Sequence, residues 1–422
     1  MSNLGILVGG GPAPGINSVI AAASIRSLLE HVDVIGIRDG FEAIMQDDIS
    51  RVTPLTIEAM SRLHFRGGST LGTSRANPTK KRESMDAVLR SLEKLGIASL
   101  ITIGGDDTAF SAMTVSKASG GKVRVVHVPK TIDNDLDLAP DVDTFGYQTA
   151  RHVGVGLVQN LMTDAKTTSR WYLVIAMGRT AGHLALGIGK AAGATLTLIP
   201  EEFPNPEVPL RELVDTLSIA IAKRYAEGRK DGVAVLAEGL ALRLRNDDLK
   251  DLKGAELDEH GHVRLAELPF GGILKDALAK RLKEIGIKVT VVSKDIGYEL
   301  RCADPIPMDM EYCRDLGYCA AKYVLSGGDA AMISLKGGHF KPIPFSEMLD
   351  PKTGKTKVRL VDIYSARYAI ARRYMIRLRR DDFEDSGEIA KLAKVCGMTP
   401  ESFTSMFHYL VDNEPPPYPL GS

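Results

Sequence analysis

Short apolar runs alternate with longer amphipathic segments along the first part of the chain. The runs are rich in β-branched residues and bounded by glycines, which favours strands, and the segments between them repeat with a helical period. Strands are predicted over residues 4–8, 33–37, 99–103 and 123–128, and helices over residues 17–29, 83–95 and 108–116. Strands that are apolar throughout are typical of parallel sheets covered on both faces, so the pattern predicts a βαβ series.

A second series of the same kind follows. Its strands are predicted over residues 171–176, 195–199, 232–236 and 288–292, and its helices over residues 145–163, 181–191, 209–226 and 272–284. Beyond it, the sequence predicts a helix over residues 309–325, a strand over residues 330–335 and a basic helix over residues 366–379. The predicted fold class is α/β, with two doubly wound, Rossmann-like α/β/α domains and an active site in the cleft between them.

The domain boundaries follow from these series. We expect a first domain over residues 1–140, completed by part of 300–360, and a second over residues 141–300. A polar stretch near residues 243–262 is predicted to be a surface insertion, and residues 361–422 a helical C-terminal extension. The proline-rich residues 414–419 can neither continue a helix nor pair in a sheet.

Composition removes several classes of function. Among 422 residues, Lys plus Arg and Asp plus Glu both number 53, so no net charge draws the protein to nucleic acid or to an anionic membrane. No apolar stretch approaches the roughly 20 residues of a membrane span. The N-terminus has no basic region of the kind that begins a signal peptide, and the four cysteines fit neither a zinc site nor a disulfide framework. We therefore expect a cytoplasmic protein whose cysteines are reduced packing residues.

Candidate chemistry lies in the turns that follow the strands. The loop Gly9-Gly10-Gly11-Pro12-Ala13-Pro14-Gly15 leads into a helix, which suits either phosphate binding or simple chain reversal. It matches neither the Walker pattern nor the dinucleotide fingerprint. A second turn, residues 67–75, offers hydroxyl groups and Arg75, or is only a flexible surface loop.

Two further turns carry carboxylates. Gly104-Gly105-Asp106-Asp107-Thr108 ends a strand, and adjacent carboxylates there suit Mg²⁺, while Asp107 or Thr108 could also cap a helix. The run Pro129-Lys130-Thr131-Ile132-Asp133-Asn134-Asp135 places a lysine, a hydroxyl and two carboxylates at the same sheet edge. Phosphoryl transfer to a hydroxyl needs this inventory of a cation, a metal ligand and a proton acceptor.

At these residues the chain resembles the phosphofructokinase family. The glycine loop, the Gly104-Gly105-Asp106 turn, the run from Thr131 to Asp135 and Met177-Gly178-Arg179 are similar to that family's motifs, in its order, from about residue 4 to about residue 301. The resemblance implies that Asp133 removes the proton from the sugar 1-hydroxyl and that Asp106 serves Mg²⁺. It also implies that Thr131 and Asp135 assist at the transferred phosphoryl group, so the first domain would bind the phosphoryl donor.

Two positions distinguish branches of this family. Members that use ATP resemble Gly-Gly-Asp-Gly and Pro-Gly-Thr-Ile-Asp-Asn-Asp, whereas this chain has Asp107 and Lys130 in place of those glycines. Both side chains add bulk and charge where the α-phosphate and ribose of a nucleotide would lie. Lys130 could also pair with pyrophosphate, for which Gly11, Arg75, Asp107 and Lys130 are the candidate ligands.

The resemblance also names an acceptor side in the second domain. Fructose 6-phosphate would be held at the turn of Met177, Gly178 and Arg179, with Arg179 stabilising charge on the moving phosphoryl group. Glu238 matches a carboxylate that contacts sugar hydroxyls. Tyr298 and Arg301 are similar to the pair that holds the 6-phosphate. Arg170, and less certainly aligned Lys294, match residues that reach a neighbouring subunit's site, which implies a homodimer or homotetramer.

Three hypotheses about function remain open on the sequence alone. The leading one is reversible transfer of a phosphoryl group from pyrophosphate to fructose 6-phosphate. In the second, the reaction is the same but the donor is ATP, or sedoheptulose 7-phosphate is also an acceptor. A third is a catalytically inactive sugar-phosphate sensor, against which the intact Asp106, Asp133 and Arg179 argue. Residues 18–25, in the helix after the glycine loop, lack the arginines that bind an effector phosphate in bacterial ATP-dependent relatives.

Overall fold

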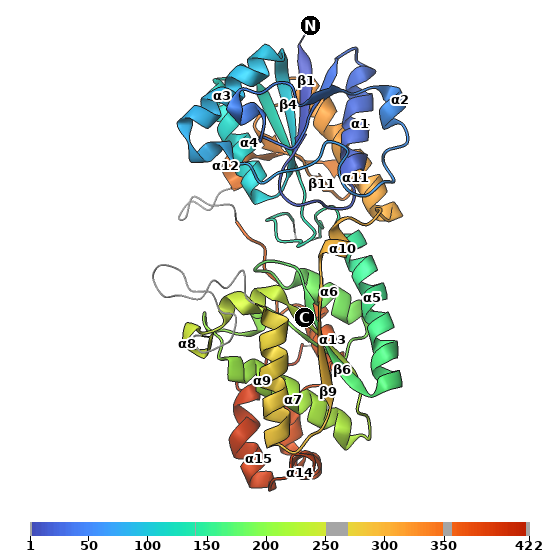
Figure 1. Cartoon of the computed structure of the whole chain (residues 1–422), viewed down its shortest axis with the longest axis vertical. Coiled ribbons are helices and arrows are strands. Elements are labelled where there is room, and N and C mark those ends of the chain that lie inside the picture. The colour runs from blue at the N-terminus through green and yellow to red at the C-terminus, as the bar shows by residue number, and fades with distance from the viewer. Residues whose placement is uncertain (1, 140, 250–268, 349–356, 419–422) are drawn as a thin grey trace. The chain divides into compact units, whose positions relative to one another are not determined.

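The computed structural model describes residues 2–139, 141–249, 269–348 and 357–418. The chain forms two compact units, one of residues 1–150 and 298–359 and the other of residues 151–297 and 360–422 (Figure 1). The predicted insertion near 243–262 lies for the most part outside the described residues. Within the described ranges no helix is long and apolar enough to cross a membrane.

The first unit contains a seven-stranded sheet in the order β13-β10-β5-β4-β1-β2-β3. The five inner strands are parallel, and the short strands at the two edges, β3 and β13, are antiparallel to their neighbours. The strands are β1 (Asn3–Val8), β2 (Val34–Ile37), β3 (Val52–Pro54), β4 (Ile97–Gly104), β5 (Arg124–Pro129), β10 (Ala331–Met332) and β13 (Ile343–Pro344). Both edge strands escaped prediction. The single strand predicted over 330–335 is divided between β10 and the start of β11 (Leu335–Lys336), which pairs with β12 (His339–Phe340) in a separate sheet.

The helices of this unit form a layer on each side of the sheet. On one side α1 (Ile16–Leu28) packs against α11 (Pro307–Leu325), and on the other α3 (Arg82–Lys94) packs against α4 (Asp106–Ser119) (Figure 1). Val88 and Leu92 of α3, with Ala112 and Val115 of α4, are buried in one hydrophobic cluster with Leu100 and Val125 of the sheet. The predicted doubly wound arrangement is confirmed.

The strand order places a topological switch between β1 and β4. The chain moves from β1 outward to β2 and then returns past β1 to β4, β5 and β10. In open α/β sheets, ligands bind outside the carboxyl ends of the strands at such a switch. The loops that follow β1 and β4 are the glycine loop and the Gly104-Gly105-Asp106 turn.

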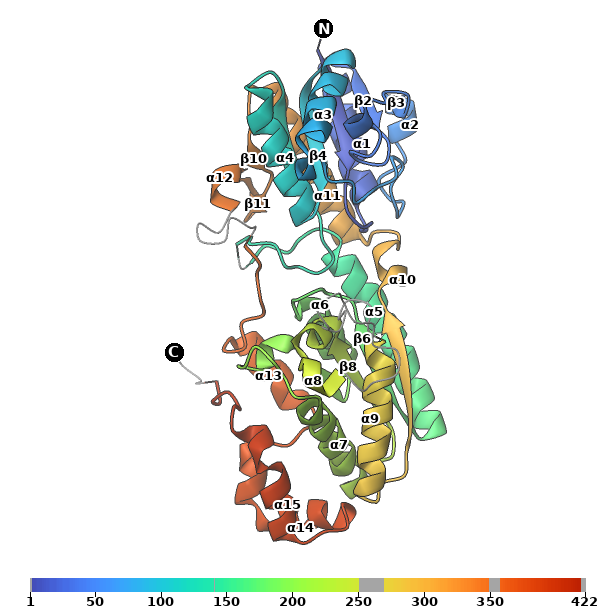
Figure 2. The ribbon, with the colours of Figure 1, turned by 60° about the vertical axis from the view of Figure 1, so that its left-hand side comes forward.

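The second unit contains a four-stranded, fully parallel sheet in the order β7-β8-β6-β9. Its strands are β6 (Arg170–Ala176), β7 (Leu196–Leu198), β8 (Gly232–Ala237) and β9 (Thr290–Ile296). Its helices include α5 (Tyr147–Thr168), α6 (His183–Ala192), α7 (Leu210–Ala226) and α9 (Phe270–Glu284), of which α7 and α9 pack side by side (Figure 2). Here the strand order switches direction between β6 and β8.

The predicted strand over residues 288–292 was too short at its carboxyl end. β9 pairs with β6 from Arg170↔Thr290 to Ala176↔Ile296, so Lys294 lies within the strand and not in the loop after it. Because β9 is an edge strand, Lys294 and Asp295 stay exposed while their backbone is paired. These two charged residues interrupt the apolar pattern without interrupting the strand.

The C-terminal residues belong to the second unit. The basic helix predicted over 366–379 ends early, as α13 (Ala366–Tyr374), because the chain then runs extended and the Ile376 N–H donates to the Thr195 carbonyl at 2.8 Å. Arg379, which was predicted to lie in the helix, instead follows its end. Its guanidinium donates hydrogen bonds to the carbonyl oxygens of Arg372, Arg373 and Met375. Farther on, α14 (Ser386–Val395) packs on α7 and on α15 (Pro400–Phe407).

The cysteines divide by position. Cys313 and Cys396 are buried, and no cysteine is in a disulfide. Cys313 lies so close to the glycine loop that a Cβ on Gly15 would be 2.3 Å from its Sγ. Cys302 is exposed, so the prediction that all four cysteines are packing residues is wrong for this one.

Candidate active site

The glycine loop is held against the second predicted turn. The Gly10 N–H donates to the Ser74 carbonyl at 2.8 Å, and the Thr73 hydroxyl donates to the Gly10 carbonyl at 2.6 Å. Gly10 has φ 81°, in the left-handed region that favours glycine. Residues 67–75 are therefore tied to the glycine loop by backbone bonds, which brings the exposed Arg75 to this edge of the sheet.

Thr108 of α4 packs between the ends of β1 and β4. A Cβ on Gly9 would lie 2.4 Å from the Thr108 Oγ1, and a Cβ on Gly104 would lie 2.4 Å from both the Cβ and the Oγ1 of Thr108. These two glycines are thus required by close approach and not by backbone conformation. The helix α4 begins at Asp106 with Gly105 as its N-cap, so the alternative that Asp107 or Thr108 caps it is wrong.

Asp106 and Asp107 occupy the first turn of α4, where the helix dipole favours negative charge. Asp107 is exposed and Asp106 is half-buried. Within the described residues, no cluster of three or more His, Cys, Asp or Glu side chains is arranged to hold a metal ion. Mg²⁺ usually takes only one or two protein carboxylates and completes its shell with waters and substrate phosphates. The adjacent carboxylates fit that kind of site.

The turn after β5 buries its charged side chains. Lys130, Asp133 and Asp135 are only 4%, 6% and 3% exposed. The Lys130 ammonium group donates to the Gly11 carbonyl, and the Lys130 N–H donates to the Gly104 carbonyl at 2.8 Å. One residue therefore joins the turn after β5 to the loops after β1 and β4.

A buried histidine supports the same edge. His127 of β5 is fully buried, with its Nε2 3.0 Å from the Gly104 carbonyl and its Nδ1 2.8 Å from the Thr102 Oγ1. A carbonyl can only accept, so Nε2 carries the proton and Nδ1 accepts from the Thr102 hydroxyl. Burial lowers the pKa of His127 to about 3, and the nearby Lys130 charge acts in the same direction. The imidazole is thus neutral at physiological pH.

The acceptor turn of the second unit is organised by Glu238. This residue follows β8, and its Oε1 accepts the N–H of Gly178 at 3.0 Å and of Arg179 at 2.7 Å. Arg179 has φ 50°, an unfavourable conformation for a side chain of its size, and is exposed. Gly239 permits this arrangement, because a Cβ there would lie 2.4 Å from the Arg179 carbonyl oxygen. The structure therefore unites Met177, Gly178, Arg179 and Glu238 at the switch point between β6 and β8.

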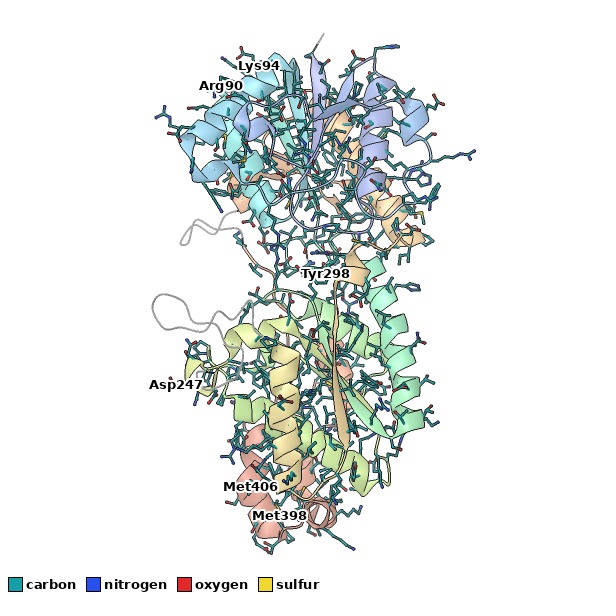
Figure 3. The ribbon with its side chains drawn as sticks, viewed as in Figure 1. Arg90, Lys94, Asp247, Tyr298, Met398 and Met406 are labelled. Carbon is teal, nitrogen blue, oxygen red and sulfur yellow. The ribbon has the colours of Figure 1, made fainter. Side chains whose placement is uncertain are left out.

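Tyr298 and Arg301 lie in the first unit, in the short helix α10 (Tyr298–Arg301). The Arg301 guanidinium stacks 4.6 Å from the centre of the Tyr298 ring. Tyr298, labelled in Figure 3, is 72% exposed. A Cβ on Gly11 would lie 3.1 Å from Arg301 Nη1. Arg301 and Lys130 thus place two cationic side chains beside the glycine loop.

Arg170 is separated from the other predicted acceptor residues. It is the first residue of β6, whereas Met177 follows the end of that strand, so the two are about 20 Å apart. Arg170 instead lies 3.8 Å from Asp164 of α5. Lys294 is exposed on β9, in register with Val174. Neither residue therefore lies in the turn held by Glu238.

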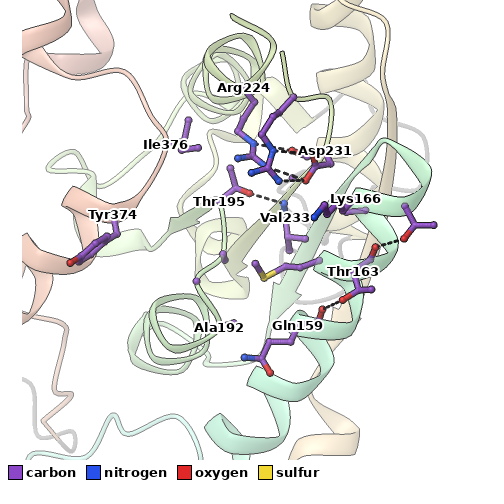
Figure 4. A pocket seen from close by; sticks show the side chains of 17 residues that line it. Gln159, Thr163, Lys166, Ala192, Thr195, Arg224, Asp231, Val233, Tyr374 and Ile376 are labelled. Atoms are coloured by element: carbon purple, nitrogen blue, oxygen red, sulfur yellow. Dashed lines mark hydrogen bonds and ion pairs between the residues drawn. The ribbon is translucent and has the colours of Figure 1, made fainter. Parts of the chain in front are cut away.

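A cavity of about 910 Å³ in the second unit contains none of the predicted site residues. It opens at the edge where β8 begins, opposite the edge that carries Glu238, and its charged residues include Arg224, Arg229 and Asp231 (Figure 4). Asp231 lies 3.0 Å from Arg224 and 3.1 Å from Arg229, so these charges largely satisfy one another. Size alone therefore does not identify the functional site.

The comparisons with known proteins agree with the geometry. Residues 3–324 match the family model described as phosphofructokinase. The chain is 51% identical to the pyrophosphate–fructose 6-phosphate 1-phosphotransferase of Thermotoga maritima (97% of this chain, 99% of the relative). It is 49% identical to the protein of that name from Naegleria fowleri (97% and 95%). An α/β protein with glycine-rich turns at the carboxyl ends of its strands is thus a member of a known group, and the chain belongs to the phosphofructokinase family.

Solved structures support the fold. The phosphofructokinase of Saccharomyces cerevisiae superposes with a TM-score of 0.66 at 20% identity, over 97% of this chain and 50% of the yeast chain. The chain therefore spans about half the length of that relative. The pyrophosphate-dependent phosphofructokinase of Nitrosospira multiformis gives a TM-score of 0.65 at 16% identity, over 100% of this chain and 95% of the other. The predictions of family and fold class are confirmed.

The sequence analysis missed His127 and Thr102 as supports of the site. A signal was present, because both are polar residues in the middle of runs that are otherwise apolar, and both strands are buried on both faces. Buried polar groups need hydrogen-bond partners, so their presence in such strands indicates a specific contact. Their role was not apparent until the register paired Thr102 with His127.

Proposed function

We propose that the protein transfers a phosphoryl group reversibly from pyrophosphate to the 1-hydroxyl of fructose 6-phosphate, giving fructose 1,6-bisphosphate and phosphate. The observation that carries this proposal is the buried turn after β5, which combines Asp133 and Asp135 with a lysine bound to the Gly11 carbonyl. The names of the relatives from Thermotoga maritima and Naegleria fowleri support the same activity.

In the proposed mechanism, Asp133 accepts the proton of the sugar 1-hydroxyl as that oxygen attacks phosphorus. Thr131 and Asp135, in the same turn, orient the reacting groups, and Arg179 stabilises charge on the moving phosphoryl group. Glu238 fixes the backbone of the turn that carries Arg179 through two N–H groups. Asp106, with Asp107 beside it, would hold Mg²⁺, which neutralises phosphate charge when bound.

The choice of donor rests on Lys130 and Asp107. The Lys130 ammonium, held on the Gly11 carbonyl, lies within reach of a phosphate on the glycine loop, where a Cβ on Gly10 would be only 3.6 Å from its Nζ. Arg75 and Arg301 add positive charge near the same loop. Pyrophosphate is small and highly charged, so a site with a buried cation and little room favours it over a nucleotide.

The experiment compares donors on two proteins. Turnover of fructose 6-phosphate is measured with pyrophosphate and with ATP for the native protein and for the double variant Lys130→Gly/Asp107→Gly. We expect the native protein to prefer pyrophosphate, and the variant to lose at least about tenfold of that preference. A native protein that prefers ATP would overturn the donor assignment and leave the fold and the acceptor assignment standing.

The same assay separates the remaining alternatives. Sedoheptulose 7-phosphate in place of fructose 6-phosphate tests the breadth of the acceptor site. Absence of turnover with every donor, combined with saturable binding of fructose 6-phosphate, would favour the inactive sensor. Omission of Mg²⁺ tests the metal requirement, with loss of turnover expected because the phosphate charges would be left unneutralised.

A homo-oligomer with shared sites is the proposed assembly. Arg170 begins β6, about 20 Å from the turn that ends it, so it cannot serve that turn within one chain. We expect Arg170→Ala to raise KM for fructose 6-phosphate, and light scattering to give at least a dimer. A monomer with full activity would contradict this assembly.

A further inference from the structure

Residues 131–139 and 141–144 belong to the loop that carries Asp133 and Asp135 from β5 towards α5. Asn134, between the two carboxylates, has φ 58°, in the left-handed region that asparagine adopts more readily than most residues with a side chain. Its side chain organises the loop, because the Thr144 N–H donates to its Oδ1 at 2.9 Å. The Thr144 hydroxyl donates to the Thr131 carbonyl at 2.6 Å. The position of the proposed base therefore depends on how this loop is held.

Arg359, more than 200 residues farther along the chain, binds this loop from outside. Its backbone N–H donates to the Asp135 carbonyl at 2.8 Å. Its guanidinium donates to the carbonyls of Asn134 at 3.2 Å, Ala139 at 3.1 Å and Val142 at 2.8 Å. It also donates to the Asn134 side-chain oxygen. The planar guanidinium of Arg359 thus links the residue next to Asp133 with the later part of the loop.

The charge of Arg359 suits this role. The group is half-buried, and burial lowers its pKa from the usual value, but a guanidinium stays protonated in proteins. Neighbouring negative charges act in the opposite direction and raise the pKa of Arg359. Asp143 has the largest such effect, and Asp135 also contributes. Asp143 is itself fixed to the loop through the Asn134 amide at 2.8 Å. The cation is therefore neutralised by the loop that it holds.

Arg359 lies outside the part of the chain that the family model matches, which ends at residue 324. Its acceptors are mainly backbone carbonyls, which every sequence of this loop would present. The bonds do not go to the hydrophobic core but to the segment that carries the carboxylates. A lysine could not reproduce them, because its single ammonium group cannot span carbonyls on both sides of the loop.

We propose that Arg359 is a positioning residue for the phosphoryl transfer, which holds the loop of Asp133 and Asp135 in its reactive geometry without touching the substrates. The inference rests on the proposed function. A base displaced by about 1 Å can cost on the order of 100-fold in rate, while the binding groups on the other loops are left in place. The effect is therefore expected in kcat and not in KM.

The test compares Arg359→Ala and Arg359→Lys with the matched control Arg379→Ala. Arg379 also donates its guanidinium to three backbone carbonyls, but in the C-terminal part of the second unit. With fructose 6-phosphate and pyrophosphate as substrates, we expect kcat of Arg359→Ala to fall about 100-fold, with both KM values little changed. Arg359→Lys should be intermediate, and Arg379→Ala close to the wild type.

Two further measurements separate positioning from folding. Methylguanidinium ion added to Arg359→Ala should restore part of kcat, and it should not restore activity to Asp133→Ser. Amide hydrogen exchange should accelerate in residues 131–144 and stay unchanged in the strands of the sheet. If Arg359→Ala does not fold, Arg359→Lys decides the question by the same kcat and KM readouts.

The outcomes against the proposal are distinct. Arg359 variants with wild-type kcat, or with normal kcat and raised KM, would overturn the positioning role while the proposed function stands. A wild-type protein without turnover would overturn the proposed function and this inference with it.

Discussion

The two sheets present their candidate residues at the same kind of place but hold them differently. Beside the switch point of the first sheet, in the turn after β5, Lys130, Asp133 and Asp135 are almost completely buried, and Arg359 binds the loop that carries them. At the switch point of the second sheet, Arg179 is exposed and its turn is held by two bonds to Glu238. The first site is enclosed by the protein, and the second is open to solvent.

This difference matches the chemistry that each half would perform. A proton acceptor and a cation that act in the transition state gain most from being fixed before the substrate arrives. A turn that binds and releases a sugar phosphate must exchange ligand and water, which favours an open site. Substitutions in the first half should therefore act on kcat, and substitutions in the second half, apart from those of Arg179 itself, on KM for the sugar phosphate.

The largest effect is expected for Asp133→Ser. Loss of the proposed base should lower kcat by about 10²- to 10⁴-fold, because that is the usual contribution of general base catalysis. KM for pyrophosphate should change little, since other loops bind the donor. Steady-state kinetics measures both values, and circular dichroism checks the fold.

The matched control is Asp141→Ser, which removes an exposed carboxylate from the same loop. It should behave like the wild type. Turnover of Asp133→Ser at the wild-type rate would exclude Asp133 as the base.

A smaller effect is expected for Glu238→Gln. The amide oxygen can still accept from Gly178 and Arg179, but a neutral acceptor is weaker than a carboxylate by about 1 kcal/mol per bond. We expect KM for fructose 6-phosphate to rise by up to about 30-fold, with kcat and KM for pyrophosphate less affected. The exposed Glu207, changed to Gln, serves as the control. If kcat fell with KM unchanged, the proposed division of roles between the two halves would be wrong.

The smallest effect on turnover at neutral pH is expected for His127→Gln, which keeps a donor near the Gly104 carbonyl. The more informative quantity is the free energy of unfolding at acidic pH. The unfolded chain binds a proton at His127 near pH 6.5, whereas the folded protein excludes it until about pH 3. The stability that this group contributes is thus present above pH 6.5 and is lost as the pH falls towards 3, by on the order of 5 kcal/mol.

Urea unfolding of the first unit at several pH values between 7 and 4 measures this contribution. The free energy of unfolding of the wild type should fall more steeply with falling pH than that of His127→Gln. The difference in slope should correspond to the uptake of up to one additional proton on unfolding. The exposed His339, changed to Gln, should leave the wild-type slope intact. Equal slopes for wild type and His127→Gln would mean that His127 titrates normally in the folded protein.

The parts of the structure that the sequence predicted have local signals. Each of the turns after β1, β4, β5 and β6 follows an apolar run, so its place at the carboxyl edge of a parallel sheet could be inferred before the fold was known. The types of residue in those turns then indicated phosphoryl transfer. The cap of α4 shows the limit of this reasoning, because it is Gly105, two residues before the nearer candidate, Asp107.

The parts that escaped prediction depend on contacts that the periodic pattern of the sequence does not show. Arg359 resembles any surface arginine until its carbonyl acceptors are seen. Arg379 continued a basic helical pattern, yet it folds back on the carbonyls that end the helix. Lys294 looked like a loop residue because charge on an edge strand interrupts the apolar run but not the pairing. In each case the position of the residue is set by a contact with residues that the local sequence pattern does not identify as its partners.

The packing of Thr108 between Gly9 and Gly104 has a consequence for how this sequence can change over time. Alanine at either glycine would collide with Thr108, but the two collisions involve different atoms. Against Gly9 the closest atom is the Thr108 Oγ1, and the Thr108 Cβ is 3.2 Å away, so Thr108→Ala would make room for Gly9→Ala. Against Gly104 the Thr108 Cβ itself is 2.4 Å away, and only glycine at position 108 would relieve it. The first glycine can therefore be replaced after one permissive substitution, whereas the second is fixed for as long as any side chain occupies position 108.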